Sequence, residues 1–153
     1  MKVLKAKFGK IPTNADCLIY NLFQTGTGTS RVDRFIRYDL KDVFWDETKE
    51  ANAIRMGTSN ASSVNMFVDN LKDYVSSSEW KLLTIEEMQK KFTFQKTDYI
   101  IQSTSFTIDA PKEFNSESAL TTYFGLDYAH KIMSFDEKIL PNRSTSHYEI
   151  AGQ

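Results

Sequence analysis

The sequence predicts a single α+β domain over residues 1–153, with an antiparallel or mixed sheet and two to three helices in the middle of the chain. β-forming segments gather in the first 40 residues and again in the last third, and helical patterns fall between them. A length of 153 residues is typical of one hydrophobic core, and 41% apolar with 25% charged residues is ordinary globular usage.

The amino-terminal part is expected to form strands and a hairpin. Residues 3–8 alternate apolar side chains with lysine, and residues 16–24 are rich in Ile, Tyr, Leu and Phe, which favour strands. A second alternating segment covers residues 31–40. Gly26 and Gly28 lie between the two segments, and glycine tolerates the backbone conformations of tight turns. We therefore interpret residues 16–40 as a β-hairpin.

Helices are expected in the middle of the chain. Apolar residues at positions 64, 67, 68, 71, 74 and 75 recur at helical spacing, so the pattern predicts a helix over residues 64–75, with Ser76, Ser77 and Ser78 ending it. Residues 80–83 are interpreted as a short buried strand or as the entry segment of the next element. Residues 84–87, Thr-Ile-Glu-Glu, can form a capping box and predict a second helix.

The last third returns to a β pattern. Aromatic and branched residues within 92–108, interrupted by polar residues, predict a hairpin. Residues 119–134 suit either a short helix or a strand, because Gly125 weakens a helix and the aromatic residues also favour a strand. Residues 138–140 and 146–150 are the last expected strands.

Composition excludes several classes of function. The 19 basic and 20 acidic side chains nearly cancel, so nothing indicates a nucleic-acid partner. The single cysteine, Cys17, has apolar neighbours typical of a buried strand and suits a reducing compartment. No apolar segment is long enough for a signal peptide or a bilayer span. We expect an intracellular, cytoplasmic protein with no membrane association, in the host cytoplasm if it is viral.

Candidate metal and anion sites are weak. The two histidines, His130 and His147, have no cysteine nearby and match no zinc spacing, so no metal is predicted. The loop at residues 25–30 lacks the Lys-Ser/Thr ending of a phosphate-binding loop, which favours a plain hairpin loop or a contact loop. The arginines at positions 31, 34 and 37 are interpreted as a solvated or interface set.

One pattern resembles a known enzyme family. Ser103-Thr104-Ser105 within an apolar strand, and Glu137 just before residues 138–140, resemble two landmarks of the mono-ADP-ribosyltransferases. The resemblance implies NAD as cofactor, with Ser103 bracing the NAD pocket and Glu137 engaging the nicotinamide ribose. Lys81 stands where the family has an arginine, and a lysine cannot form the arginine's bidentate fork.

The leading interpretation is a non-enzymatic interaction or assembly protein that acts through protein–protein contacts and needs no cofactor. A composition rich in Asn, Ser, Thr and Phe resembles accessory or structural proteins of viruses, phages and mobile elements, and closed homo-oligomers are the commonest soluble assemblies. The alternative is an enzyme of the ADP-ribosyltransferase kind. The expected contact residues lie in the first hairpin loop and in a later aromatic segment, and they are Thr25, Gly26, Thr27, Gly28, Phe114, Tyr123 and Phe124.

Overall fold

The chain is mostly β-strand, so the expected α+β class is wrong. The computed structural model describes residues 12–50, 61–138 and 147–153, and the strand expected at residues 3–8 lies outside them. The elements follow one another as β1 (Ala15–Thr25), η1 (Gly28–Ser30), β2 (Val32–Glu50), β3 (Ala61–Val68), α2 (Ser77–Trp80), α3 (Ile85–Met88), β4 (Tyr99–Gln102), β5 (Glu113–Phe114), α4 (Glu117–Phe124), β6 (His130–Lys138) and β7 (His147–Gly152).

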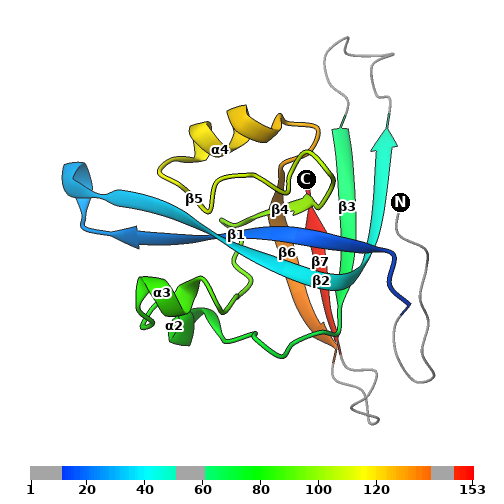
Figure 1. Cartoon of the computed structure of the whole chain (residues 1–153), viewed down its shortest axis with the longest axis horizontal. Helices are drawn as coiled ribbons and strands as arrows, with labels where there is room; N and C mark the ends of the chain where they lie inside the picture. Colours follow the sequence, from blue (N-terminus) through cyan, green and yellow to red (C-terminus); the bar gives the residue numbers. More distant parts are fainter. Residues whose placement is uncertain (1–11, 51–60, 139–146) are drawn as a thin grey trace.

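Six strands close into an antiparallel barrel (Figure 1). Neighbouring strands are hydrogen-bonded in the order β1-β4-β6-β7-β3-β2, and β2 pairs with β1 again, which closes the ring. β5 joins β2 from outside through the pairs Phe35–Phe114 and Ile36–Glu113. In an α+β fold, helices would cover the apolar face of an open sheet. Here the sheet closes on itself and encloses its apolar face.

β2 pairs with β1 along one part and with β3 along another, because it bends at Asp42. Residues up to Val43 pair with β1, and residues from Phe44 onward pair with β3. Asp42 has a φ of 60°, a left-handed conformation that is uncommon outside glycine. Its N–H donates a hydrogen bond to Asp16 Oδ1 at 3.0 Å, which fixes the bend. β2 is therefore one continuous strand of 19 residues that pairs with β1 along its first part and with β3 along its last part.

The helix expected at residues 64–75 is wrong, because its first residues belong to β3. Val64, Met66 and Val68 point into the barrel and are buried, whereas Phe67 lies on the other face and is only partly buried. Apolar residues at positions 64, 66 and 68 fit a strand as well as positions 64, 67 and 68 fit a helix. Pairing with β2 and β7 on both sides decides between the two patterns.

The helices begin at capping residues. Ser76 caps α2, where the sequence predicted the end of a helix, and buried Trp80 lies in α2 and not in a strand. The capping box predicted at residues 84–87 is confirmed, with Thr84 and Glu87 bonding each other's backbone. α4 lies in the segment that suited either a helix or a strand, and it ends at Gly125, which has a φ of 85°.

The hairpin expected at residues 92–108 is also wrong. β4 pairs with β1 and β6, and the residues after it form turns, in which the Thr107 hydroxyl donates to the Thr104 carbonyl at 2.9 Å. β6 and β7 pair with each other near the last expected strands, although residues 139–146 lie outside the described ranges.

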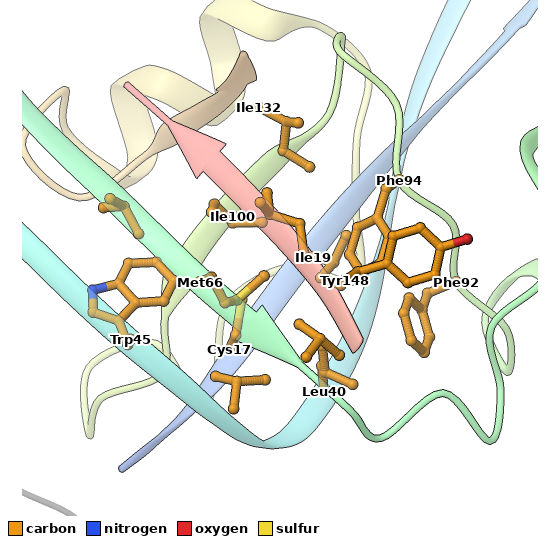
Figure 2. Packing of buried hydrophobic residues seen from close by; sticks show 14 of the residues in the cluster. Cys17, Ile19, Leu40, Trp45, Met66, Phe92, Phe94, Ile100, Ile132 and Tyr148 are labelled. Carbon is orange, nitrogen blue, oxygen red and sulfur yellow. The ribbon is translucent and has the colours of Figure 1, made fainter. Parts of the chain in front are cut away.

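The barrel interior is a packed apolar core (Figure 2). Ile19, Leu40, Met66 and Ile100 are at most 1% exposed and come from four different strands. Cys17 lies among them at 1% exposure, so the predicted buried strand position is confirmed, and burial raises the pKa of its thiol. The thiol is therefore a core side chain and not a nucleophile.

Candidate protein-interaction site

A β-ribbon projects from the barrel. β4 pairs with β1 only along Cys17–Tyr20, so from residue 21 onward β1 has β2 as its one strand neighbour among the residues that the structure describes. The β1–β2 register continues to the pair Thr25–Val32. We call residues 21–36 the arm and residues 24–32 its tip; Figure 1 shows the arm extending away from the barrel at the left.

The base of the arm is covered on both faces. Cross-strand pairs in a ribbon point alternately to its two faces. On one face Phe23 packs edge-on against Trp80 of α2, with ring centroids 6.2 Å apart, and Ile36 joins the same buried cluster. On the other face Leu22 and Phe35 belong to a cluster whose further members include Phe114, Leu120 and Phe124 of β5 and α4. The arm therefore leaves the barrel in a fixed direction.

A buried carboxylate fastens the inner end of the arm. Asp98 has no exposed surface, and it accepts hydrogen bonds from the Asn21 amide at 2.7 Å and the Leu22 N–H at 2.8 Å. The Gln95 amide donates to Asp98 at 3.1 Å and to the Leu22 carbonyl at 3.2 Å. Burial raises the pKa of Asp98 to about 7, against the opposing effect of these donors. These bonds take the place of the strand pairing that β4 no longer supplies.

The tip is exposed and has a defined conformation. Every side chain from residue 24 to residue 32 is exposed. Gly26 and Gly28 have φ angles of 77° and 59°, and the 3-10 turn η1 follows. The Ser30 hydroxyl donates to the Thr27 carbonyl at 2.8 Å. The predicted hairpin loop is thus an ordered turn at the end of a supported ribbon.

The later group of expected contact residues is divided by the fold. Phe114 and Phe124 are 7% and 4% exposed and belong to the cluster beneath α4, while Tyr123 is 46% exposed. Sequence reasoning missed two exposed rings close by, Phe106 and Tyr128, which contact each other with centroids 5.4 Å apart. The aromatic and branched residues around Phe106 fit a strand pattern, so the sequence does not indicate that this ring lies on the surface in a turn.

The residues that carry the resemblance to ADP-ribosyltransferases are not brought together. β4 and β6 are antiparallel and pair at Ile100 and His130. Ser103 lies three residues beyond that pair in one direction and Glu137 seven residues beyond it in the other, so the two strands carry these residues away from each other. Lys81 is exposed at the end of α2. The geometry therefore gives these three residues no shared NAD site.

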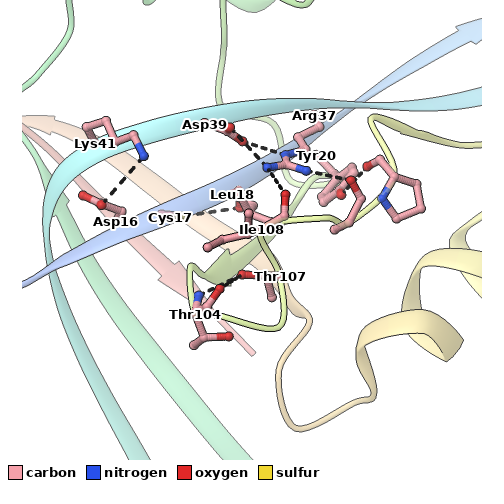
Figure 3. A network of polar contacts seen from close by, with 12 residues as sticks. Asp16, Cys17, Leu18, Tyr20, Arg37, Asp39, Lys41, Thr104, Thr107 and Ile108 are labelled. Carbon is pink, nitrogen blue, oxygen red and sulfur yellow. Dashed lines mark hydrogen bonds and ion pairs between the residues drawn. The ribbon is translucent and has the colours of Figure 1, made fainter. Parts of the chain in front are cut away.

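The arginines at positions 31, 34 and 37 are each engaged by a carboxylate. Arg31 pairs with Asp33 at 3.1 Å, Arg34 forms a two-pronged bond with Glu113, and Arg37 pairs with Asp39 at 2.6 Å. Arg37 also donates to the carbonyls of Ala110 and Ile108; Figure 3 shows this network. An arginine fork that is already satisfied in this way is a poor anion clamp.

The histidines lie apart from each other. His130 is 1% exposed, with its Nε2 3.5 Å from Glu47 Oε1, and His147 Nε2 lies 3.1 Å from Glu149 Oε1. Within residues 12–50, 61–138 and 147–153, no group of three His, Cys, Asp or Glu side chains has the geometry to hold a metal ion.

A notch of about 630 Å³ opens beside β2, next to the place where β5 begins. Its lining comes from β2, from the chain just after α3 and from the segment before β5, and consists of Arg37, Tyr38, Asp39, Gln89, Lys90, Ile108, Asp109, Ala110 and Lys112. The hydrogen bond from Tyr20 to the Pro111 carbonyl at 2.6 Å and the Arg37 bonds hold the walls in place. A second cavity of about 360 Å³ lies over β3, β6 and β7.

Comparison with known proteins gives one match. A family model described as "Family of unknown function (DUF6751)" matches residues 12–153. No curated protein and no solved structure matches the chain. Among the described helices, none is long and apolar enough to cross a membrane.

Proposed function

We propose that this chain, which belongs to the DUF6751 family of unknown function, is a non-enzymatic assembly subunit that acts through protein–protein contacts made by its arm. The observation that carries the proposal is the contrast between the two ends of the arm. The base is buried on both faces and fastened by Asp98, whereas every side chain of the tip is exposed. A supported projection with a bare end is suited to reaching a partner.

The entropy that is lost when the tip is ordered supports the same conclusion. Ordering a turn of small polar residues sacrifices chain entropy, on the order of 1 kcal/mol per residue, and no burial of apolar surface compensates for it here. A two-residue turn would close the same ribbon with fewer ordered residues. A longer, structured tip is therefore consistent with a use outside the folding of its own chain.

The expected partner is a second copy of the chain, as in a structural or accessory subunit. Formal charges nearly cancel, which removes long-range repulsion between identical subunits. The exposed ring pair Phe106–Tyr128, with Leu126 at 79% exposure beside it in sequence, supplies apolar surface of the kind that is enriched in subunit contacts.

The test is to shorten the arm and measure the mass in solution. We expect the wild-type chain to give a multiple of 17.6 kDa by size-exclusion chromatography with light scattering. Replacing residues 26–31 by Asn-Gly removes the loop of the tip and keeps the Thr25–Val32 pair, so a two-residue hairpin turn closes the ribbon in its native register. This variant is expected to run as a monomer.

Two controls make the result decisive. The shortened variant should keep its cooperative thermal transition, since its buried clusters are untouched. Leu82→Ser alters a side chain that is 87% exposed in the α2–α3 turn, away from the tip, and should leave the oligomer unchanged. A wild-type monomer, or an unchanged oligomer after removal of the tip, would refute assembly through the arm.

A further inference from the structure

One stretch of the barrel has an uncovered strand edge. β5 pairs with β2 only at Phe35 and Ile36, and β3 joins β2 from Phe44 onward. Between these points, no strand of the described ranges covers the edge of β2 opposite β1, although the Asn70 side chain donates a hydrogen bond to the Lys41 carbonyl. The Arg37 N–H bonds to the Lys112 carbonyl on this edge, so alternation along the strand directs the backbone groups of Asp39 to the same side. The notch opens over this stretch.

An open strand edge is a site for another extended backbone, because its N–H and C=O groups can continue the sheet. A small ion would not use such groups along a strand. The edge therefore favours a peptide segment as the occupant of the notch, in preference to a free anion.

The charges of the notch favour a neutral segment. Arg37, Lys90 and Lys112 face Asp39 and Asp109, so the lining is close to neutral, and Arg37 is already bonded. Lys90 and Lys112 form no ion pair with another residue that the structure describes. Their ammonium groups are available to donate hydrogen bonds to carbonyl and hydroxyl oxygens.

The tip of the arm offers the matching groups. Residues 25–30 carry no charge, and their exposed side chains include three threonines and one serine, whose hydroxyls can accept hydrogen bonds. The tip cannot enter the notch of its own chain, because Arg37 lies five residues beyond Val32 on the same stiff ribbon, about 17 Å away. Any insertion of the tip must occur between chains.

We propose that the notch receives the arm tip of a second copy of this chain, so that subunits join head to tail. This inference rests on the proposed assembly function and adds the surface on which the arm docks. A contact between tip and notch uses two different surfaces of each subunit, so a chain whose notch is filled still offers its own tip to another subunit.

Cross-linking between introduced cysteines tests the contact. The double variant Thr27→Cys/Lys90→Cys, treated with a short bismaleimide, is expected to give a ladder of covalent oligomers on a denaturing gel. The native Cys17 is a silent background, since it is 1% exposed. Thr27→Cys/Lys112→Cys provides a second pair across the same notch, in case Lys90 itself is needed for docking.

Matched variants separate the outcomes. Thr27→Cys/Leu82→Cys places the second thiol at a position that is 87% exposed and lies outside the notch, and each single variant reports collisional dimers. Light scattering on the same samples comes first: a monomer would refute the assembly function itself. An oligomer that gives a ladder only with Leu82→Cys, or with none of the pairs, would leave assembly standing and overturn docking in the notch.

Discussion

The two glycines of the tip differ in what a side chain would meet. A Cβ on Gly26 would lie 2.4 Å from the Ser30 carbonyl oxygen, whereas a Cβ on Gly28 meets nothing within 4 Å. Both residues have positive φ. We expect Gly28→Ala to lower the free energy of unfolding by about 1 kcal/mol, the ordinary penalty of a left-handed alanine. Gly26→Ala should cost clearly more, because the backbone of the turn must shift.

Urea unfolding of the two single variants measures this difference. Equal losses would mean that the turn relaxes freely around Gly26. From the sequence, both glycines are simply residues that permit a tight turn. The structure separates a position that shapes the tip, Gly26, from one that can be changed with less disturbance, Gly28.

The buried carboxyl of Asp98 should make stability depend on pH. Its pKa is raised to about 7 by burial, so between roughly pH 4 and pH 7 the folded chain holds a proton that the unfolded chain releases. The free energy of unfolding should therefore fall as the pH rises through this range, by an amount on the order of 3 kcal/mol. Thermal unfolding followed from pH 5 to pH 8 measures the slope.

Asp98→Asn supplies the comparison. The amide does not titrate, so its unfolding curve should be flatter over the same range, although its NH₂ group replaces an acceptor of the Asn21 bond and should lower stability at every pH. Glu117 has the opposite behaviour, because hydrogen bonds from Tyr99 and Lys131 lower its pKa, and its contribution is lost only on acidification. Parallel slopes for wild type and Asp98→Asn would exclude Asp98 as the source.

At the scale of elements, α2 supports the arm through one residue. Trp80 is fully buried and contacts Phe23 edge-on, so Trp80→Ala should cost about 3–5 kcal/mol. The same change should speed hydrogen exchange along residues 21–25. Leu82→Ala, two residues away and 87% exposed, should alter neither quantity. Unchanged hydrogen exchange in a folded Trp80→Ala variant would show that the contacts on the opposite face of the arm, with β5 and α4, are sufficient to hold it.

Elements could be predicted from the sequence where local chemistry decides them. The first hairpin follows from two β-forming segments around Gly26 and Gly28, and the start of α3 follows from the Thr84–Glu87 capping box. The segment at residues 64–75 could not be assigned in this way, since its apolar spacing fits both periods. Strand β3 exists because β2 and β7 flank it, and that information lies far away in the chain.

At the scale of the whole molecule, closure of the barrel was not predictable from the sequence. It depends on pairings such as Ile100–His130 and on the bend at Asp42, neither of which has a local signature. The candidate site was likewise only partly predictable from the sequence. The loop residues Thr25–Gly28 were named from the glycines, whereas the notch joins residues near positions 38, 90 and 110 that only the fold brings together.

The position of β7 has a consequence for protein synthesis. This strand lies between β6 and β3, so residues 148–152 must pair with residues 64–68 before the ring closes. During synthesis, residues 64–68 are made long before residues 148–152. Until β7 is made, β3 and β6 lack the strand that lies between them. Exposed edges recruit other chains. A nascent or prematurely terminated polypeptide that lacks β7 is therefore the species in which aggregation should begin, and the one that chaperones would need to shield.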